Sequence, residues 1–344
     1  MDAQREILQF LHYNRRSSRM EIACSTDFQG SEATLKRLLA VMCKNGDIIT
    51  EGKARATRYS LSPMAHLLMP LNLDTYFAKD IDERRVQTSY NFQLINQEMQ
   101  EIQLFTKDET DYLNELHNEF TRNVSEMSEL EYRKEMQRLG IDLSWKSSQI
   151  EGNTYSLLET ERLLRESKTA DGKTKEEAIM LLNHKEALRF VLDNPDYLLS
   201  LSVSRIEDIH SLLTKDLSID KGLRHRRVGI SGTNYHPLDN EFQIREAMHD
   251  TCQLINSRNS VFEKALLALL LLSYIQPFTD GNKRTARIVS NAILIANKYC
   301  PLSFRTVDSI DYKKAMLMFY EQNNLYAFKQ IFMQQFEFAI KEYF

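Results

Sequence analysis

An unbroken apolar run, Ala265–Leu272, constrains the fold of this chain more than any other segment. The run is far shorter than the roughly 20 residues that span a bilayer, so it predicts a buried helix. Pro277 should end that helix, because the residue before a proline is pushed out of helical conformation. A second helix is expected from about Asn282 to about Tyr299. Two core helices should therefore meet at a tight turn around Gly281.

The rest of the chain also predicts helices. Only 10 glycines and 6 prolines occur among 344 residues, and helical patterns continue from Glu109 almost to the C-terminus. One segment differs: Gly222–Pro237 holds three glycines separated by β-forming residues, which predicts a β-hairpin. We therefore expect a mainly α fold with a helical core and a small β-hairpin.

Residues 1–62 predict a separate N-terminal domain. Three helical patterns precede two strand patterns, at Ala3–Tyr13, Ser18–Cys24, Ser31–Met42, Asp47–Glu51 and Thr57–Leu61. This order resembles a winged helix-turn-helix. Residues 63–110 would then form a connector and a leading helix, and residues 111–344 would form the second domain.

The charge of the N-terminal domain differs from that of the chain. The whole chain carries a net charge of −4, which gives no case for nucleic-acid binding, whereas residues 1–62 hold ten Lys or Arg and seven Asp or Glu residues. The basic residues that lie where a winged helix meets DNA are Lys36, Arg37, Lys44, Lys53, Arg55 and Arg58. DNA binding is one interpretation of this domain. Protein contact, including formation of a homodimer, is the other.

The scattered cysteines favour a cytoplasmic protein, and the longest apolar run, Ala265–Leu272, is too short for a membrane segment. Four scattered cysteines form no CxxC pair, so no zinc site is expected, and they suit a reducing compartment. The N-terminal residues lack the apolar core of a signal peptide.

The turn at residues 280–282 has the chemistry of an anion site. It stands at the start of a helix, where free backbone N–H groups and the positive end of the helix dipole attract anions. Arg284 and Arg287 follow on one helical face and offer two cationic forks suited to phosphate. Asp280 is a suitable Mg²⁺ ligand beside phosphate oxygens. The simpler alternative is a capped buried helix that carries two surface arginines.

The stretch Gln276–Arg287 resembles the signature of the Fic (Fido) family, His-Pro-Phe-x-Asp/Glu-Gly-Asn-Gly/Lys-Arg-x-x-Arg. It matches eight of the nine fixed positions, and the exception is the histidine, which is Gln276 here. Ser147–Asn153 resembles the inhibitory motif of the family, within a predicted helix at about residues 142–153. Gly222–Pro237 resembles the β-hairpin flap that holds a target segment. The resemblance covers roughly residues 70–340.

The resemblance implies an enzyme that moves AMP from ATP to a Ser, Thr or Tyr hydroxyl of a protein. It implies that Asp280 holds Mg²⁺, that Arg284 binds the β-phosphate and that Arg287 binds the γ-phosphate. The nucleotide site as a whole would comprise Phe278, Gly281, Asn282, Lys283, Arg284 and Arg287. A protein target would dock as an added strand along Gly229, Ile230, Ser231, Gly232, Thr233 and Asn234.

The inhibitory residues implied by the resemblance are Ser147, Glu151 and Gly152. Glu151 would pair with Arg287 and so compete with the γ-phosphate for the same guanidinium. The alternative for Glu151 is an ordinary structural ion pair.

Gln276 occupies the position of the catalytic base. An amide has no useful basicity, and general-base catalysis contributes about 10²–10⁴-fold, so we expect severely impaired transfer. His225 or His236 could replace the base only if the flap places one of them at the turn. Three functions follow: an autoinhibited, impaired protein AMP-transferase, a non-catalytic nucleotide-sensing DNA-binding regulator, or a Fic-fold enzyme with other phosphate chemistry.

Overall fold

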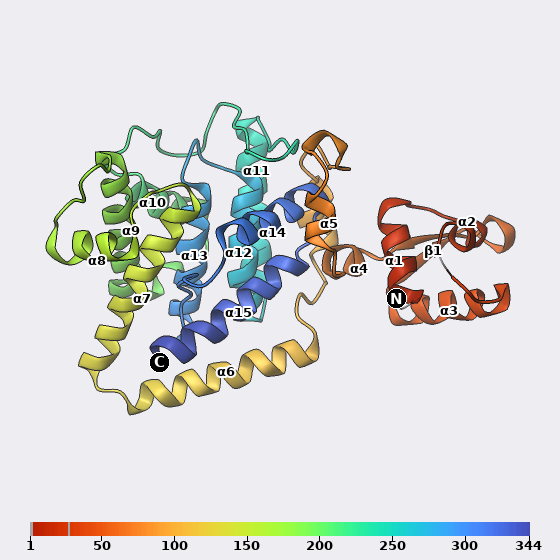
Figure 1. Cartoon of the computed structure of the whole chain (residues 1–344), viewed down its shortest axis with the longest axis horizontal. Coiled ribbons are helices and arrows are strands. Elements are labelled where there is room, and N and C mark those ends of the chain that lie inside the picture. The colour runs from red at the N-terminus through yellow and green to blue at the C-terminus, as the bar shows by residue number, and fades with distance from the viewer. Residues whose placement is uncertain (1–2, 27) are drawn as a thin grey trace.

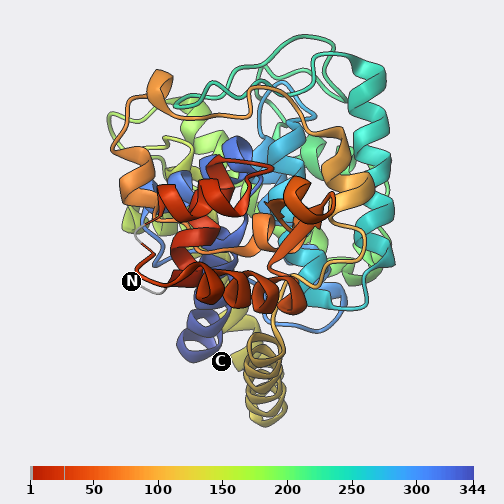
Figure 2. The same ribbon diagram turned by 90° about the vertical axis from the view of Figure 1, so that its right-hand side faces the viewer.

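The computed structural model describes residues 3–26 and 28–344, and helices dominate it, as predicted (Figure 1). A small N-terminal part lies at one end of the molecule, and a larger helical body follows it (Figure 1). In the view turned by 90°, the N-terminal part lies in front of that body (Figure 2). No helix within the described residues is long and apolar enough to span a membrane.

The N-terminal part has the predicted order of elements. Its helices and strands are α1 (Ala3–Tyr13), α2 (Arg19–Ser25), α3 (Glu32–Asn45), β1 (Ile48–Glu51) and β2 (Arg58–Leu61). The strands are antiparallel, with Ile48 opposite Leu61. Ser18 and Ser31 cap the second and third helices through their hydroxyls, and Gly46 ends α3 in the left-handed conformation. Its identity as a winged helix stays a prediction.

The connector runs from the N-terminal part to the helical body. It contains α4 (Pro63–Leu68), α5 (Leu73–Phe77), a 3₁₀ turn (Ile81–Glu83) and a π-helical turn (Leu94–Glu98). The chain then enters α6 (Lys107–Glu126), whose capping box is formed by Thr106 and Glu109.

The helical body is built around two central helices. α12 (Val261–Ile275) and α13 (Asn282–Ala296) pack extensively against each other. Around them lie α7 (Glu129–Ile150), α8 (Leu157–Glu166), α9 (Lys175–Asp193), a 3₁₀ turn (Pro195–Leu198), α10 (Val203–Leu213), α11 (Glu241–Ser257), α14 (Ser309–Gln322) and α15 (Tyr326–Tyr343).

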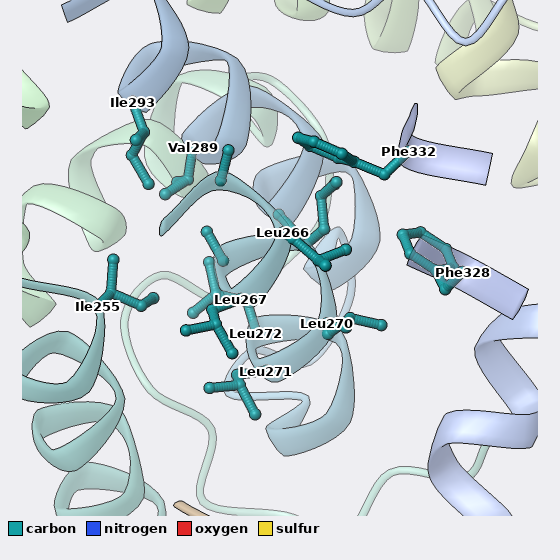
Figure 3. Close-up of a cluster of buried hydrophobic side chains, with 14 of the residues drawn as sticks. Ile255, Leu266, Leu267, Leu270, Leu271, Leu272, Val289, Ile293, Phe328 and Phe332 are labelled. Carbon is teal, nitrogen blue, oxygen red and sulfur yellow. The ribbon is translucent and has the colours of Figure 1, made fainter. Parts of the chain in front are cut away.

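The apolar run of α12 explains why it lies at the centre. Every residue from Ala265 to Ile275 is buried, so the helix has no solvent-facing side. Its leucines point toward Val289 and Ile293 of α13, Ile255 of α11, and the α15 rings Phe328 and Phe332 (Figure 3). A helix that is apolar all round must be enclosed by other helices, and this enclosure fixes the position of the turn that follows it.

The segment Gly222–Pro237 is not a β-hairpin, which corrects the prediction. All of its residues are described, and it is an irregular loop whose one bridge partner is Ser89 of the connector, opposite His236. Its polar groups bind elsewhere: the Gly232 carbonyl accepts from Arg84 at 2.7 Å, and the His236 N–H donates to Thr88. The loop therefore satisfies its backbone against the connector instead of pairing with itself. We call residues 222–237 the flap.

Candidate functional site

The turn between α12 and α13 is held by Asn282. Its side-chain oxygen accepts from the Phe278 N–H at 2.8 Å, and its amide nitrogen donates to the Phe278 carbonyl at 2.8 Å. Gly281 precedes it with φ of 79°, a conformation that costs glycine little. His210 of α10 stacks on the Phe278 ring at 3.8 Å and bonds to the Asp280 carbonyl at 2.9 Å. These contacts fix the conformation of the turn.

A pocket of about 360 Å³ opens above this turn. It brings together residues from the end of α7, the flap, the turn and α14. The predicted site residues among its lining are Glu151, Gly152, Gly229, Ile230, Ser231, Gln276, Asp280, Gly281, Asn282, Lys283 and Arg284. The other predicted residues do not line it: Phe278, Arg287 and Ser147 are buried behind it, and Gly232, Thr233 and Asn234 continue along the flap.

Arg284 is a buried cation with unused donors. Its side chain is 1% exposed, and one terminal nitrogen contacts an Asp280 oxygen at 3.3 Å. Its Nε and its other terminal nitrogen have no hydrogen-bond partner within the described residues. Burial lowers the pKa of Arg284, and the neighbouring Asp280 opposes that effect. A buried charge with unmade hydrogen bonds is costly, and an anion in the pocket would relieve that cost.

Asp280 could supply one ligand of a divalent-cation site. Its side chain is 66% exposed beside the pocket, and one of its oxygens accepts from the Gly281 N–H at 2.6 Å. The described residues contain no group of three or more His, Cys, Asp or Glu that could form a complete metal site. A single carboxylate fits Mg²⁺ only where phosphate oxygens and water supply the other ligands.

Arg287 is fully buried and fully engaged. Its Nε donates to the Ser147 hydroxyl at 2.8 Å, and a terminal nitrogen donates to the Ser147 carbonyl at 2.9 Å. The same terminal nitrogen lies 3.0 Å from Glu151, and the other lies 3.3 Å from the Tyr312 hydroxyl. The arginine on the deeper turn of α13 is thus occupied by protein groups.

Glu151 stands at the C-terminus of α7, 21% exposed, between two cations. One carboxylate oxygen contacts Arg287 and the other lies 3.3 Å from Lys283. Burial alone would raise the pKa of Glu151, but the charges of Arg287 and Lys283 outweigh burial and hold that pKa below its ordinary value. The carboxylate is therefore ionised at neutral pH and closes the Arg287 side of the pocket.

His184 of α9 supports the same group of contacts from behind. Its Nε2 lies 2.8 Å from the Ser147 hydroxyl that also contacts Arg287. Burial, followed by the charges of Arg287 and Arg284, lowers the pKa of His184 to about 3. The imidazole is therefore neutral at pH 7 and cannot repel the arginines.

Gln276 lines the pocket, but its amide is turned back onto α12. It adopts a left-handed conformation with φ of 51°, and its Nε2 donates to the Ser273 carbonyl at 2.6 Å. Neither His225 nor His236 lines the pocket, and His225 contacts Glu241 at 2.9 Å. The flap therefore places no imidazole in the pocket beside Gln276.

Two parts of the site were missed by sequence reasoning. Tyr312, Met316 and Tyr320 line the pocket from α14, and their spacing of four residues is the only local signal that could have found them. Arg224, which is 2% exposed, donates to the Gln276 carbonyl at 2.6 Å and to the Arg226 carbonyl at 2.7 Å. It fixes the base of the flap to the turn, a long-range contact without a sequence signal.

Part of the chain is similar in sequence to known proteins. The Fic/DOC family model matches residues 200–294. Protein adenylyltransferase fic-1 of Caenorhabditis elegans is 28% identical over 162 residues, which are 44% of this chain and 31% of that protein. Protein adenylyltransferase Fic of Nematostella vectensis is 29% identical over 175 residues, 49% of this chain and 40% of that protein. The chain thus spans about a third of the length of these curated relatives.

Solved structures show the same fold. Fic-1 (aa134 - 508) from C. elegans superposes with a TM-score of 0.59 at 23% identity, over 69% of this chain and 72% of that one. A Fic domain containing signaling protein from Bacteroides thetaiotaomicron gives a TM-score of 0.57 at 17% identity, over 67% and 94%. Residues 200–294 therefore match the Fic/DOC family model, and the helical body around them has the fold of these Fic structures.

Proposed function

We propose that this protein binds ATP at the turn between α12 and α13 and is built to transfer AMP to a hydroxyl of a protein. The observation that carries the proposal is Arg284, a buried guanidinium with two unused nitrogen atoms in a pocket at a helix N-terminus. Relatives named protein adenylyltransferase support the same chemistry.

Different residues of the turn would bind different parts of the triphosphate and its Mg²⁺. The N-terminus of α13 and Arg284 would bind phosphate oxygens, and Asp280 would hold Mg²⁺. The bound Mg²⁺ would neutralise phosphate charge. In the transfer, the target oxygen forms a bond to the α-phosphorus, the bond from that phosphorus to the bridging oxygen breaks, and pyrophosphate leaves. The proton of the target hydroxyl has to be taken up by a base.

Glu151 would act as an internal brake on this reaction. Its carboxylate occupies the Arg287 guanidinium that a third phosphate group would need. Lys283 holds the second carboxylate oxygen, so the brake is attached at two points. ATP could then seat its phosphates fully only by displacing Glu151.

Gln276 would make transfer slow even with the brake released. Its amide donates to Ser273 and cannot accept a proton near neutral pH. The absence of a general base predicts a rate about 10²–10⁴-fold below that of a variant with histidine at this position. We therefore expect the protein to bind ATP but to transfer AMP from it slowly.

Labelling with ATP that carries a radioactive α-phosphate tests the function. The chain, Gln276→His, and Gln276→His with Glu151→Gly are incubated with Mg²⁺ and a cell lysate. We expect transfer to protein to rise in that order. The double variant with a further Arg284→Met change is the matched control and should lose the label. The proposal fails if the folded double variant labels neither itself nor any lysate protein.

A second candidate function is a non-catalytic regulator that senses nucleotide and binds DNA. Gln276 favours it, and so do Lys36, Arg37 and Lys53, whose side chains are exposed on the N-terminal part. A gel shift with the promoter DNA of its own gene, at low salt and with or without ATP, separates the two functions. Binding that weakens with salt and changes with ATP supports the regulator, and absence of binding at low salt rejects it.

A further inference from the structure

A second pocket lies between the N-terminal part and the connector and shares no lining residue with the pocket at the turn. Its volume is about 780 Å³, within the range of small-molecule sites. Its walls are α1, the end of α2, α5 and the connector between Lys79 and Arg85. We call it the interdomain pocket.

The interdomain pocket carries an excess of positive charge. Its lining includes the cations Arg5, Lys79, Arg84 and Arg85 but only one acidic residue, Glu6. Arg5 and Lys79 are exposed, and neither makes an ion pair or hydrogen bond with the described part of the chain. An anion would be attracted to this group of like charges and would reduce their mutual repulsion.

Arg84 supplies the second observation. Its side chain is only 5% exposed, and its Nε is buried without a hydrogen-bond partner in the residues described. Its terminal nitrogens are engaged, one at 3.3 Å from Glu321 and the other at 2.7 Å from the Gly232 carbonyl. A buried unpaired N–H of a charged group in a pocket wall is a donor that an incoming anion can use.

Aromatic rings stand beside these cations. Phe10, Tyr13 and Tyr76 line the same pocket, with Arg85 over the Tyr13 ring at 5.8 Å and Arg84 over the Tyr76 ring at 6.0 Å. Rings next to guanidinium groups provide a surface on which a flat ring can stack, while the cations hold a phosphate. The lining therefore suits a ligand that has both a ring and a phosphate.

We propose that the interdomain pocket binds a small phosphorylated molecule with a flat ring, of the size of a nucleoside monophosphate. The site is distinct from the nucleotide pocket at the turn and does not depend on the transfer reaction.

A ligand bound in this pocket would alter the contacts that hold the flap. Arg84 connects it to the flap through Gly232 and to α14 through Glu321, which follows the pocket-lining Tyr320. Arg85 donates to the Tyr13 carbonyl of α1 at 2.8 Å, so the same short segment also holds the N-terminal part. A ligand that draws Arg84 toward its phosphate therefore changes the support of the flap.

Calorimetric titration with AMP tests the proposal. It is done on the full chain in an Arg284→Met background, which suppresses binding at the turn, and is repeated with Lys79→Glu and with Arg85→Glu. We expect saturable AMP binding that weakens about tenfold or more in each charge-reversed variant, because a charge-assisted contact is lost and repulsion is added. Adenosine, which lacks the phosphate, should not bind. Lys175→Glu, an exposed change on α9, is the matched control and should bind as the background does.

Hydrogen exchange of the flap gives the second readout. AMP should alter exchange at residues 229–235 in the background protein but not in Lys79→Glu at the same AMP concentration. AMP affinity that is unchanged in both charge-reversed variants overturns the proposed site. Binding that leaves flap exchange unchanged overturns the connection through Arg84.

Discussion

Arg284 and Arg287 lie one turn apart on α13 and are equally buried, yet their surroundings are opposite. Arg287 is surrounded by Ser147, Glu151 and Tyr312, whereas Arg284 has one contact with Asp280 and two unused nitrogens. Protein groups satisfy the donors of Arg287, whereas two donors of Arg284 stay unsatisfied. If the proposed function holds, one helix carries both a structural contact and a binding contact.

The largest expected effect is a difference in the free energy of unfolding between variants of the two arginines. Arg287→Met should destabilise the fold by about 3–5 kcal/mol, because it removes one partner of a buried network. Arg284→Met, the matched change, should alter the free energy of unfolding by no more than about 1 kcal/mol. The change breaks one contact, with Asp280, and removes two buried donors that have no partner. Denaturant unfolding of both variants measures the difference. Equal losses would show that the two arginines are held alike.

The order of effects should reverse for ATP binding. Arg284→Met should weaken ATP binding strongly, since its free donors are the ones that a phosphate would meet. In the unaltered chain Arg287 is already occupied by Glu151, so its contribution should appear only after Glu151→Gly. Calorimetry with ATP and Mg²⁺ in the two backgrounds measures this reversal.

A smaller effect concerns pH and the histidine behind Arg287. The pKa of His184 is about 3 in the folded protein, below its ordinary value of 6.5, because of burial and then the two arginines. Its contribution to stability is complete above pH 6.5 and is lost as pH falls toward 3, because the unfolded chain binds the proton first. Between pH 6.5 and 5 the loss should be about 2 kcal/mol.

Unfolding of His184→Gln over the same pH range is the control for that prediction. The glutamine does not titrate, so the variant should show a flatter dependence of stability on pH than the natural chain. Parallel curves would mean that His184 gains a proton in the folded protein as easily as in the unfolded one.

Local signals predicted much of this arrangement. The apolar run of α12, the proline after it and the Gly281 turn are short-range features, so the mainly α fold and the turn between two core helices followed from them. The contact between Glu151 and Arg287 was expected from a pair of motifs, and the structure places their atoms 3.0 Å apart.

The rest depended on contacts between distant segments. Gly222–Pro237 has the composition of a hairpin, but its backbone bonds to distant residues. Arg84 donates a hydrogen bond to the Gly232 carbonyl, and the His236 N–H donates to the Thr88 carbonyl of the connector. Arg224 and the α14 tyrosines have no local pattern that points to a ligand. Such residues are found only when packing brings them to the turn.

The smallest expected effect compares the two cations that hold Glu151. Lys283 and Glu151 are 25% and 21% exposed, so water screens their contact, whereas Arg287 is fully buried. A double-mutant cycle of Lys283→Ala and Glu151→Gln should give a coupling energy below about 1 kcal/mol. The corresponding cycle with Arg287→Met should give a clearly larger value, because that pair is shielded from solvent. Equal couplings in unfolding measurements would mean that Lys283 restrains the carboxylate as firmly as Arg287, and that the proposed displacement of Glu151 requires both contacts to break.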